Sequence, residues 1–154
     1  YQSQRDLAKS LAQLMIIYIN RFYKTKEFDI ITYIPIHSTR LQKRGFNQAY
    51  LLAKEIAHYF KIDLRQLLSR VESTTKQSKL SKKDRIYNIK DKFKVITPKQ
   101  VVNKNILIVD DIYTTGSTVN QASKILLNNG ANNIKIITIA TGKDLNLDKE
   151  VLGL

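Results

Sequence analysis

The chain has 154 residues, no cysteine and a formal net charge of +13 at pH 7. This length suits one domain that buries roughly 70% of its unfolded surface, and 43% hydrophobic residues exclude a disordered chain. Without cysteine, these residues form neither a disulfide framework nor a cysteine zinc site, which fits a cytoplasmic location. The longest apolar run, Leu14 to Ile19, is far shorter than the roughly 18 residues of a membrane span, and no signal peptide is recognisable.

The positive charge is unevenly distributed along the chain. Residues 61–104 carry thirteen Lys and Arg against four acidic residues. One interpretation is a lysine-rich surface that keeps the protein in solution, and the other is contact with nucleic acid or another polyanion. Phosphate contacts give affinity without specifying a partner, so the charge alone leaves both interpretations open.

The first part of the chain predicts two helices on either side of one strand. Residues 2–24 carry apolar side chains at helical spacing, and we expect this face to pack on the core. Its members are Leu7, Leu11, Leu14, Tyr18 and Phe22. A strand is expected over residues 29–34, followed by a basic loop over residues 36–48 and a helix from about Asn47 to Phe60.

A polar, basic stretch follows this second helix. Asp63 predicts the cap of a short helix through Leu68. Residues 69–91 contain few apolar residues, and a connection of this length is unusual in a compact domain unless it forms a lid over an active site. Residues 81–84 fit a weak capping box, so a helical turn is expected there.

The second part of the chain alternates strands and helices. Ile106 to Val109 is a continuous apolar run, typical of a strand that is covered on both faces in a parallel sheet. Further strands are expected over residues 93–96 and 134–140, with a helix over residues 117–128 between the last two strands. This alternation predicts a single α/β domain with an open parallel sheet flanked by helices, followed by an irregular acidic tail.

Two acids and a hydroxyl-rich turn follow the central strand. Asp110 and Asp111 come first, and Thr114–Thr118 then leads into the expected helix. Ligands of open α/β sheets bind at the carboxyl ends of strands, where helix N-termini point N–H groups at anions. We therefore expect a phosphate site with an acidic pair beside it for hydroxyls or a metal.

Other phosphate binders fit this pattern poorly. The chain contains neither GxxxxGK[ST] nor a GxGxxG after a strand, which excludes P-loop and dinucleotide-binding sites of those types. A phosphoacceptor receiver domain also begins with a similar acidic strand. It needs a phosphorylated aspartate and a lysine well downstream, whereas only 43 residues follow Asp111.

The pattern resembles the phosphoribosyl pyrophosphate (PRPP) signature of type I phosphoribosyltransferases. The resemblance implies that Asp110 and Asp111 contact the ribose hydroxyls and that Mg²⁺ accompanies PRPP. It also implies that one group of residues binds the 5-phosphate: Thr114, Thr115, Gly116, Ser117 and Thr118. Gly116 would let the backbone approach the anion, and the neighbouring hydroxyls would supply donors.

More distant segments resemble the ComF family, which is implicated in the uptake of single-stranded DNA into the cytoplasm during bacterial natural transformation. The matching residues lie between Ile34 and Gly142 and include Ile34–His37, the RGFNQ stretch Arg44–Gln48, Gln77, Leu80, Ser81, Arg85, Asn88 and Phe93. The resemblance implies a pyrophosphate loop formed by His37, Ser38, Thr39 and Arg40. It further implies a flexible basic hood over about residues 70–93, and partners that include single-stranded DNA and other DNA-uptake proteins such as a helicase or a recombination mediator.

Many ComF proteins carry an N-terminal ribbon in which four cysteines bind zinc. This chain has no cysteine and begins at Tyr1 rather than Met, so we expect that an N-terminal piece is missing and that any zinc belongs to it.

Three functions remain open at this stage. The first is a PRPP-binding protein of DNA uptake, with phosphoribosyltransferase turnover as an open question. The second is a non-catalytic nucleic-acid-binding module, and the third is a nucleotide-salvage phosphoribosyltransferase. The basic side chains expected to support the ligand or bind nucleic acid are Arg44, Lys79, Lys82, Lys83 and Arg85.

The remaining candidates receive a structural interpretation. We expect His37 to be a hydrogen-bonded loop residue and Phe46 to anchor its loop in the core rather than stack on a base. No residue stands out as a general base for a transferase reaction, and no acceptor is predicted.

Overall fold

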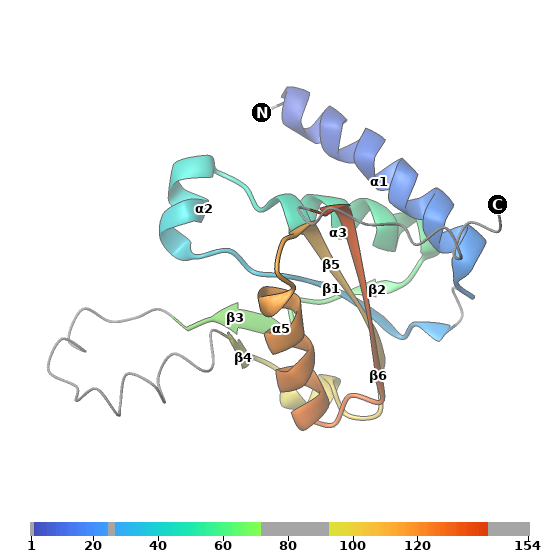
Figure 1. Cartoon of the computed structure of the whole chain (residues 1–154), viewed down its shortest axis with the longest axis vertical. Coiled ribbons are helices and arrows are strands. Elements are labelled where there is room, and N and C mark those ends of the chain that lie inside the picture. The colour runs from blue at the N-terminus through green and yellow to red at the C-terminus, as the bar shows by residue number, and fades with distance from the viewer. Residues whose placement is uncertain (1, 25–26, 72–92, 142–154) are drawn as a thin grey trace, which may run out of the picture.

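The computed structural model describes residues 2–24, 27–71 and 93–141, with side chains from Asp6 onward. A four-stranded parallel sheet of order β2-β1-β5-β6 forms its centre. These strands are β1 (Ile30–Tyr33), β2 (Asp63–Leu64), β5 (Asn105–Tyr113) and β6 (Asn133–Thr141). Helices α1 (Gln2–Phe22) and α3 (Gln48–Phe60) cover one face, and α5 (Ser117–Asn128) covers the other (Figure 1). The predicted open parallel sheet flanked by helices is confirmed.

Strand β5 is buried on both faces. Leu107 and Val109 pack into the cluster formed with α1 and α3, whereas Ile106 and Ile108 pack into the cluster on the α5 side. Successive side chains of a strand point to opposite faces, which explains why a central strand needs an uninterrupted apolar run.

Two short strands form a separate antiparallel pair. β3 (Leu68–Arg70) and β4 (Phe93–Val95) pair with Arg70 opposite Phe93. The expected hood begins and ends at this pair, and residues 72–92, including the helical turn expected at 81–84, lie outside the described residues. A 3₁₀ turn, η3 (Pro98–Gln100), connects β4 toward β5.

Two local predictions are wrong. The segment after Asp63 is extended rather than helical, because β2 pairs with β1 and Arg65 N–H donates to the Ile31 carbonyl at 3.0 Å. Leu67 and Leu68 are both fully buried, which suits an extended segment in the core better than a short surface helix. The expected basic loop contains a helix, α2 (Ser38–Arg44), which ends at Gly45 with a φ of 76°.

Helix α1 forms as predicted, but its core-facing side is not the predicted one. The buried residues are Ala8, Ala12, Met15, Ile16 and Ile19. The predicted stripe is largely exposed, at 56% for Leu7, 58% for Leu14, 50% for Tyr18 and 59% for Phe22. Both sets recur at helical spacing, so the pattern alone could not distinguish them. The alanines allow close approach to α3, which favours the set that is buried.

None of the described helices is long and apolar enough to cross a membrane.

Candidate functional site

The sheet brings the two predicted ligand segments together. β1 and β5 are adjacent parallel strands, and Ile34 N–H donates to the Val109 carbonyl at 3.1 Å just beyond β1. Their carboxyl ends therefore lie at the same edge of the sheet. The expected pyrophosphate loop begins after β1. It therefore starts close to the two acids at the end of β5 and to the expected phosphate loop that follows them.

Asp110 and Asp111 lie within the last part of β5. Alternation places Asp110 in the row of Ile108, toward α5, and Asp111 in the row of Val109. Asp110 is buried, with 8% of its surface exposed, and its Oδ1 accepts from Asp111 N–H at 2.9 Å. Asp111 is half-buried, and its Oδ1 accepts from Ile112 N–H at 2.9 Å. One carboxylate is thus held inside the site and the other at its rim.

The environment of Asp110 changes its protonation. Burial raises the pKa of Asp110 to about 7, and the negative charge of Asp111 acts in the same direction. The Asp111 N–H hydrogen bond and the positive charge of Arg70 oppose this rise in pKa. A carboxyl group with a pKa raised by burial to near neutral pH is typical of a binding or catalytic site.

The predicted phosphate loop, Thr114–Thr118, forms the N-terminus of α5. Gly116 is the N-cap with a φ of 78°, and Thr115 Oγ1 accepts from Ser117 N–H at 3.3 Å. A Cβ on Gly116 would overlap the Tyr113 hydroxyl and lie 2.7 Å from Cζ of the same ring. The left-handed backbone therefore favours glycine, and a Cβ at this position would also have to displace the Tyr113 ring. The side chains of Thr114, Thr115 and Ser117 are exposed, so hydroxyl donors surround the helix N-terminus.

Three of the four predicted pyrophosphate residues line a small cavity after β1. His37 caps α2, because its Nδ1 accepts from Thr39 N–H at 3.4 Å and lies 2.9 Å from Thr39 Oγ1. This agrees with a hydrogen-bonded loop histidine. The cavity has a volume of about 260 Å³ and is lined by Ile36, His37, Thr39, Arg40 and Arg70. Ser38 begins α2 in the same segment.

Arg70 is the site residue that sequence reasoning missed. Its Nε donates to the Pro35 carbonyl at 2.8 Å, and its guanidinium lies 5.0 Å from the centre of the Phe93 ring. Burial lowers the pKa of Arg70, as does the nearby charge of Arg40, whereas Asp110 raises it. Two cations therefore line one cavity among the described residues, and Asp110 acts on one of them, an arrangement that favours an anion. In the sequence Arg70 is one of many basic residues, and nothing local distinguishes it.

Of the other predicted basic residues, the structure describes Arg44, which does not line this cavity. Arg44 lies exposed in the last turn of α2 and forms no ion pair with the described residues. Lys79, Lys82, Lys83 and Arg85 lie outside the described residues. Phe46 is half-buried and lines a different cavity.

Asp110 and Asp111 are the carboxylates of the site that could bind a metal ion. Within the described part of the chain, no three His, Asp or Glu side chains gather to hold a metal ion. Two adjacent carboxylates nevertheless suit Mg²⁺, which keeps several waters and takes further ligands from substrate phosphates. Asp110 and Asp111 are the residues that fit such an ion.

Residues 43–151 match the family described as the phosphoribosyl transferase domain, and the chain belongs to that family. The fold is similar to that of solved structures. Glutamine PRPP amidotransferase from Bacillus subtilis superposes with a TM-score of 0.57 at 19% identity, over 88% of this chain and 26% of that one.

Curated relatives confirm the ComF resemblance. Competence protein F of Haemophilus influenzae is 32% identical over 145 residues, which are 91% of this chain and 63% of the relative. DNA utilization protein YhgH of Salmonella typhimurium is 34% identical over 140 residues, which are 88% of this chain and 61% of the relative. The chain thus spans somewhat less than two thirds of the length of these relatives.

Proposed function

We propose that this chain binds PRPP at the edge of the sheet where β1 and β5 end. PRPP presents a 5-phosphate, two ribose hydroxyls and a pyrophosphate. The proposal rests on three sets of residues at this edge, each of which suits one group of PRPP. They are the Thr114–Thr118 loop, the Asp110–Asp111 pair and the cavity lined by Arg40 and Arg70.

Each set of residues has a chemical task in this proposal. The α5 N-terminus and the hydroxyls of residues 114, 115, 117 and 118 bind the 5-phosphate. Arg40 and Arg70, with His37, Ser38 and Thr39, bind the pyrophosphate through charge and hydrogen bonds. Asp110 and Asp111 accept from the ribose hydroxyls and hold Mg²⁺, which neutralises pyrophosphate charge when it is bound.

We further propose that the protein acts in the uptake of single-stranded DNA into the cytoplasm, together with other DNA-uptake proteins. The names of its relatives, a competence protein and a DNA utilization protein, support this role. The net charge of +13 supports contact with nucleic acid, because basic side chains release counterions from phosphates. Arg44, Lys79, Lys82, Lys83 and Arg85 are the residues proposed for this contact.

Thermal unfolding with PRPP and Mg²⁺ tests the binding proposal. A ligand at 100 times its dissociation constant adds about 2.7 kcal/mol to the free energy of unfolding. We expect such an increase in wild type and its loss in Asp110→Asn/Asp111→Asn. Asp63→Asn is the matched control, because the Asp63 carboxylate pairs with Arg65 at the surface. No increase in wild type, or an equal increase in the double variant, would refute the proposal.

Turnover has a separate test. Mixing the protein with PRPP, Mg²⁺ and a panel of purine and pyrimidine bases should release pyrophosphate if the protein is a salvage enzyme. If the protein binds PRPP but releases no pyrophosphate with any base, the PRPP-binding role is supported and the salvage function is excluded.

A further inference from the structure

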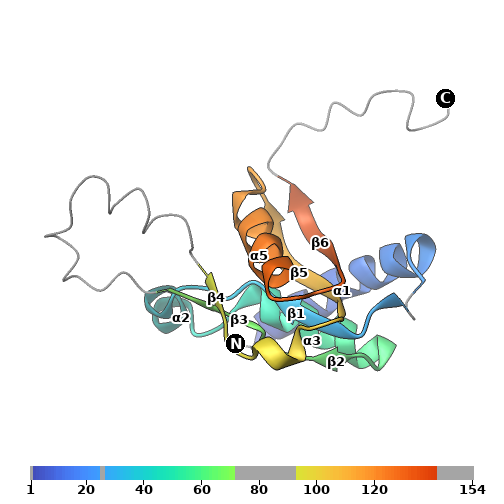
Figure 2. The ribbon, with the colours of Figure 1, turned by 90° about the horizontal axis from the view of Figure 1, so that it is seen from below.

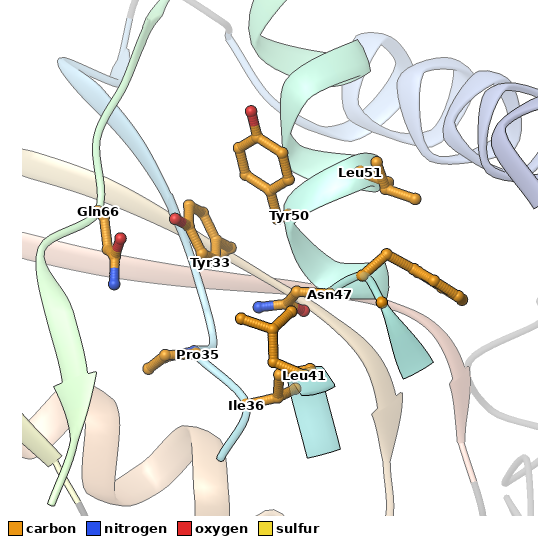
Figure 3. Close-up of a pocket in the computed structure, with 10 residues that line it drawn as sticks. Tyr33, Pro35, Ile36, Leu41, Asn47, Tyr50, Leu51 and Gln66 are labelled. Atoms are coloured by element: carbon orange, nitrogen blue, oxygen red, sulfur yellow. The ribbon is translucent and has the colours of Figure 1, made fainter. Parts of the chain in front are cut away.

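Two apolar surfaces stand out among the described residues. One is a cavity of about 410 Å³ between the end of β1 and the start of α3, shown in Figure 3. Ile36 lines both this cavity and the cavity of Arg40 and Arg70, so the first surface adjoins the proposed PRPP site. The other surface lies on α1 and on β6, the last strand of the described sheet, and it has no part in that site.

Helix α1 carries apolar side chains on two sides. The core-facing side is buried against α3 and the sheet. The second set, here called the outer stripe, recurs at helical spacing, and all its members are at least half exposed except Leu11, which is half-buried. The outer stripe consists of Leu7, Leu11, Leu14, Tyr18 and Phe22. A helix with two apolar sides is typical of one that is covered on both, and a contiguous exposed apolar patch marks an interaction site.

The outer stripe borders a groove between α1 and β6. This groove has a volume of about 430 Å³, and Leu14 and Tyr18 line it from the α1 side. Residues 136–139 line it from β6, and none of the side chains around it is charged. The Tyr18 ring lies 4.6 Å from the Phe22 ring, centre to centre, which extends the apolar surface along the helix. The groove can therefore take up a bulky apolar side chain of a partner.

The charge of the chain limits what this partner can be. A quarter of all residues are charged and the formal net charge is +13, yet residues 10–20 contain no charged residue. A charged partner would gain no counter-ion along this stretch and would lose hydration there. Two copies of the chain repel each other elsewhere, so an uncharged face is where they can meet.

The spacing of the outer stripe is nearly symmetric about Leu14. Leu11 and Tyr18 lie three and four positions from Leu14, on opposite sides of it. Leu7 and Phe22 lie seven and eight positions away, again on opposite sides. A twofold axis at Leu14 would therefore match every position of the stripe with an apolar position of a second copy. Twofold interfaces require this self-complementarity, and steps of three and four residues are those of helices that pack side by side.

We propose that the outer stripe of α1 binds the outer stripe of a second copy, in an antiparallel homodimer whose twofold axis passes near Leu14. Leu7 then lies opposite Phe22 of the second copy, and the apolar side chains of each copy cover the groove of the other. A lipid surface is the competing occupant. It would not require a symmetric stripe, and helices that lie on membranes usually carry basic residues along the polar side, which residues 10–20 lack. The inference does not depend on PRPP binding.

Sedimentation equilibrium of the full chain tests the proposal. We expect a mass of twice 17.8 kDa that falls on dilution, and we expect the dimer to strengthen with salt, because salt screens the repulsion between the copies. Leu14→Glu brings two carboxylates together at the axis and should raise the dissociation constant of the dimer at least about 100-fold. Leu127→Glu is the matched control, because it changes an exposed leucine of α5, on the other face of the sheet. Thermal unfolding checks that both variants fold.

Single cysteines test the geometry, because the chain has no cysteine of its own. Leu14→Cys lies near the axis and should form a disulfide-linked dimer on mild oxidation. Two copies of Leu7→Cys should not, because position 7 is seven residues from the axis in each copy and the two thiols would be about 21 Å apart along the helices. A mixture of Leu7→Cys and Phe22→Cys should link, since these positions face each other.

Four results would overturn the inference. The first is a wild-type chain that stays at 17.8 kDa at its highest soluble concentration. The second is an undiminished dimer in Leu14→Glu, and the third is linkage of Leu7→Cys to itself as readily as Leu14→Cys. The fourth is a monomer that binds vesicles of phosphatidylglycerol and phosphatidylcholine in wild type but not in Leu14→Glu, which would assign the outer stripe to a lipid surface.

Discussion

Arg70 Nε donates to the Pro35 carbonyl at 2.8 Å, across 35 residues of chain. The same guanidinium lies over the ring of Phe93, which is opposite Arg70 in the β3–β4 pair. One side chain thus joins the base of the expected hood to the segment that leads into the proposed pyrophosphate loop. Figure 2 shows α2, β3 and β4 gathered on the same side of the molecule, away from β6.

Replacing Arg70 should weaken PRPP binding. Arg70→Met removes a cation from the proposed pyrophosphate cavity while keeping an apolar stem for packing, and we expect the dissociation constant to rise at least about tenfold. Arg70→Lys should restore only part of this affinity, because lysine has neither the fork of donors nor the planar stack on Phe93. Titration calorimetry measures both effects. Arg65→Met removes an exposed arginine as a control, and equal affinity of Arg65→Met and Arg70→Met would contradict the role of Arg70.

The protonation of Asp110 should make stability depend on pH. Its pKa is about 7 in the folded chain against an ordinary value of 3.8. Between these values the folded state holds a proton that the unfolded state has released, so stability should fall as the pH rises from about 4 to about 7. The loss should be on the order of a few kcal/mol.

Urea unfolding of the ligand-free protein between pH 4.5 and 8 measures this effect. Asp110→Asn cannot ionise, so its stability should decline less over the same range. Asp111→Asn should flatten the profile in part, because the charge of Asp111 contributes to the raised pKa of Asp110. Parallel profiles for wild type and Asp110→Asn would show that Asp110 titrates normally.

The two apolar faces of α1 should differ in their contribution to stability. Ile19 is 1% exposed and Ile17 is 64% exposed in the same helix. Ile19→Ala creates a cavity and should lower the free energy of unfolding by about 2–5 kcal/mol, whereas Ile17→Ala should change it by less than about 0.5 kcal/mol. Chemical unfolding of the two variants compares identical substitutions. A larger loss for Ile17→Ala would reverse the assignment of the core-facing side.

Gly116 should be required for phosphate binding and not only for folding. Gly116→Ala places a methyl group against the Tyr113 ring in a left-handed backbone, which should displace the loop that begins α5. Gly130→Ala is the control, because Gly130 also has a positive φ, of 91°, but lies after α5, where the methyl group would meet Val102 at 3.4 Å. Both variants should be less stable than wild type. Only Gly116→Ala should lose stabilisation by PRPP, and retention of that stabilisation would show that the loop tolerates the change.

Some elements depend on local sequence, whereas others form only through contacts with distant segments. The helix over Ser117–Asn128 was predicted correctly, because its start follows the glycine-containing turn and its apolar spacing is local. β2 was missed because its two residues become a strand only by pairing with Ile30 and Ile31 of β1. The exposed stripe of α1 was misassigned because the choice between two helical faces is made by contact with α3.

The same distinction applies to the candidate site. The acids and the Thr114–Thr118 loop are contiguous with one strand and one helix, so a sequence pattern can reveal them. Arg70 could not be found in this way, because its contacts with Pro35 and Phe93 come from segments distant in sequence. The cavity that Phe46 lines is likewise assembled from four separate segments, although Phe46 and Asn47 belong to the RGFNQ stretch, Arg44–Gln48, that the sequence analysis identified.

Titration calorimetry of PRPP with Mg²⁺ into the wild-type chain tests the central claim most directly. The proposed site predicts saturable binding of one PRPP per chain. The affinity should fall sharply in Asp110→Asn/Asp111→Asn, fall in Arg70→Met and remain unchanged in Asp63→Asn. Absence of binding to wild type, or equal affinity in all three variants, would contradict the claim that the ends of β1 and β5 form a PRPP site.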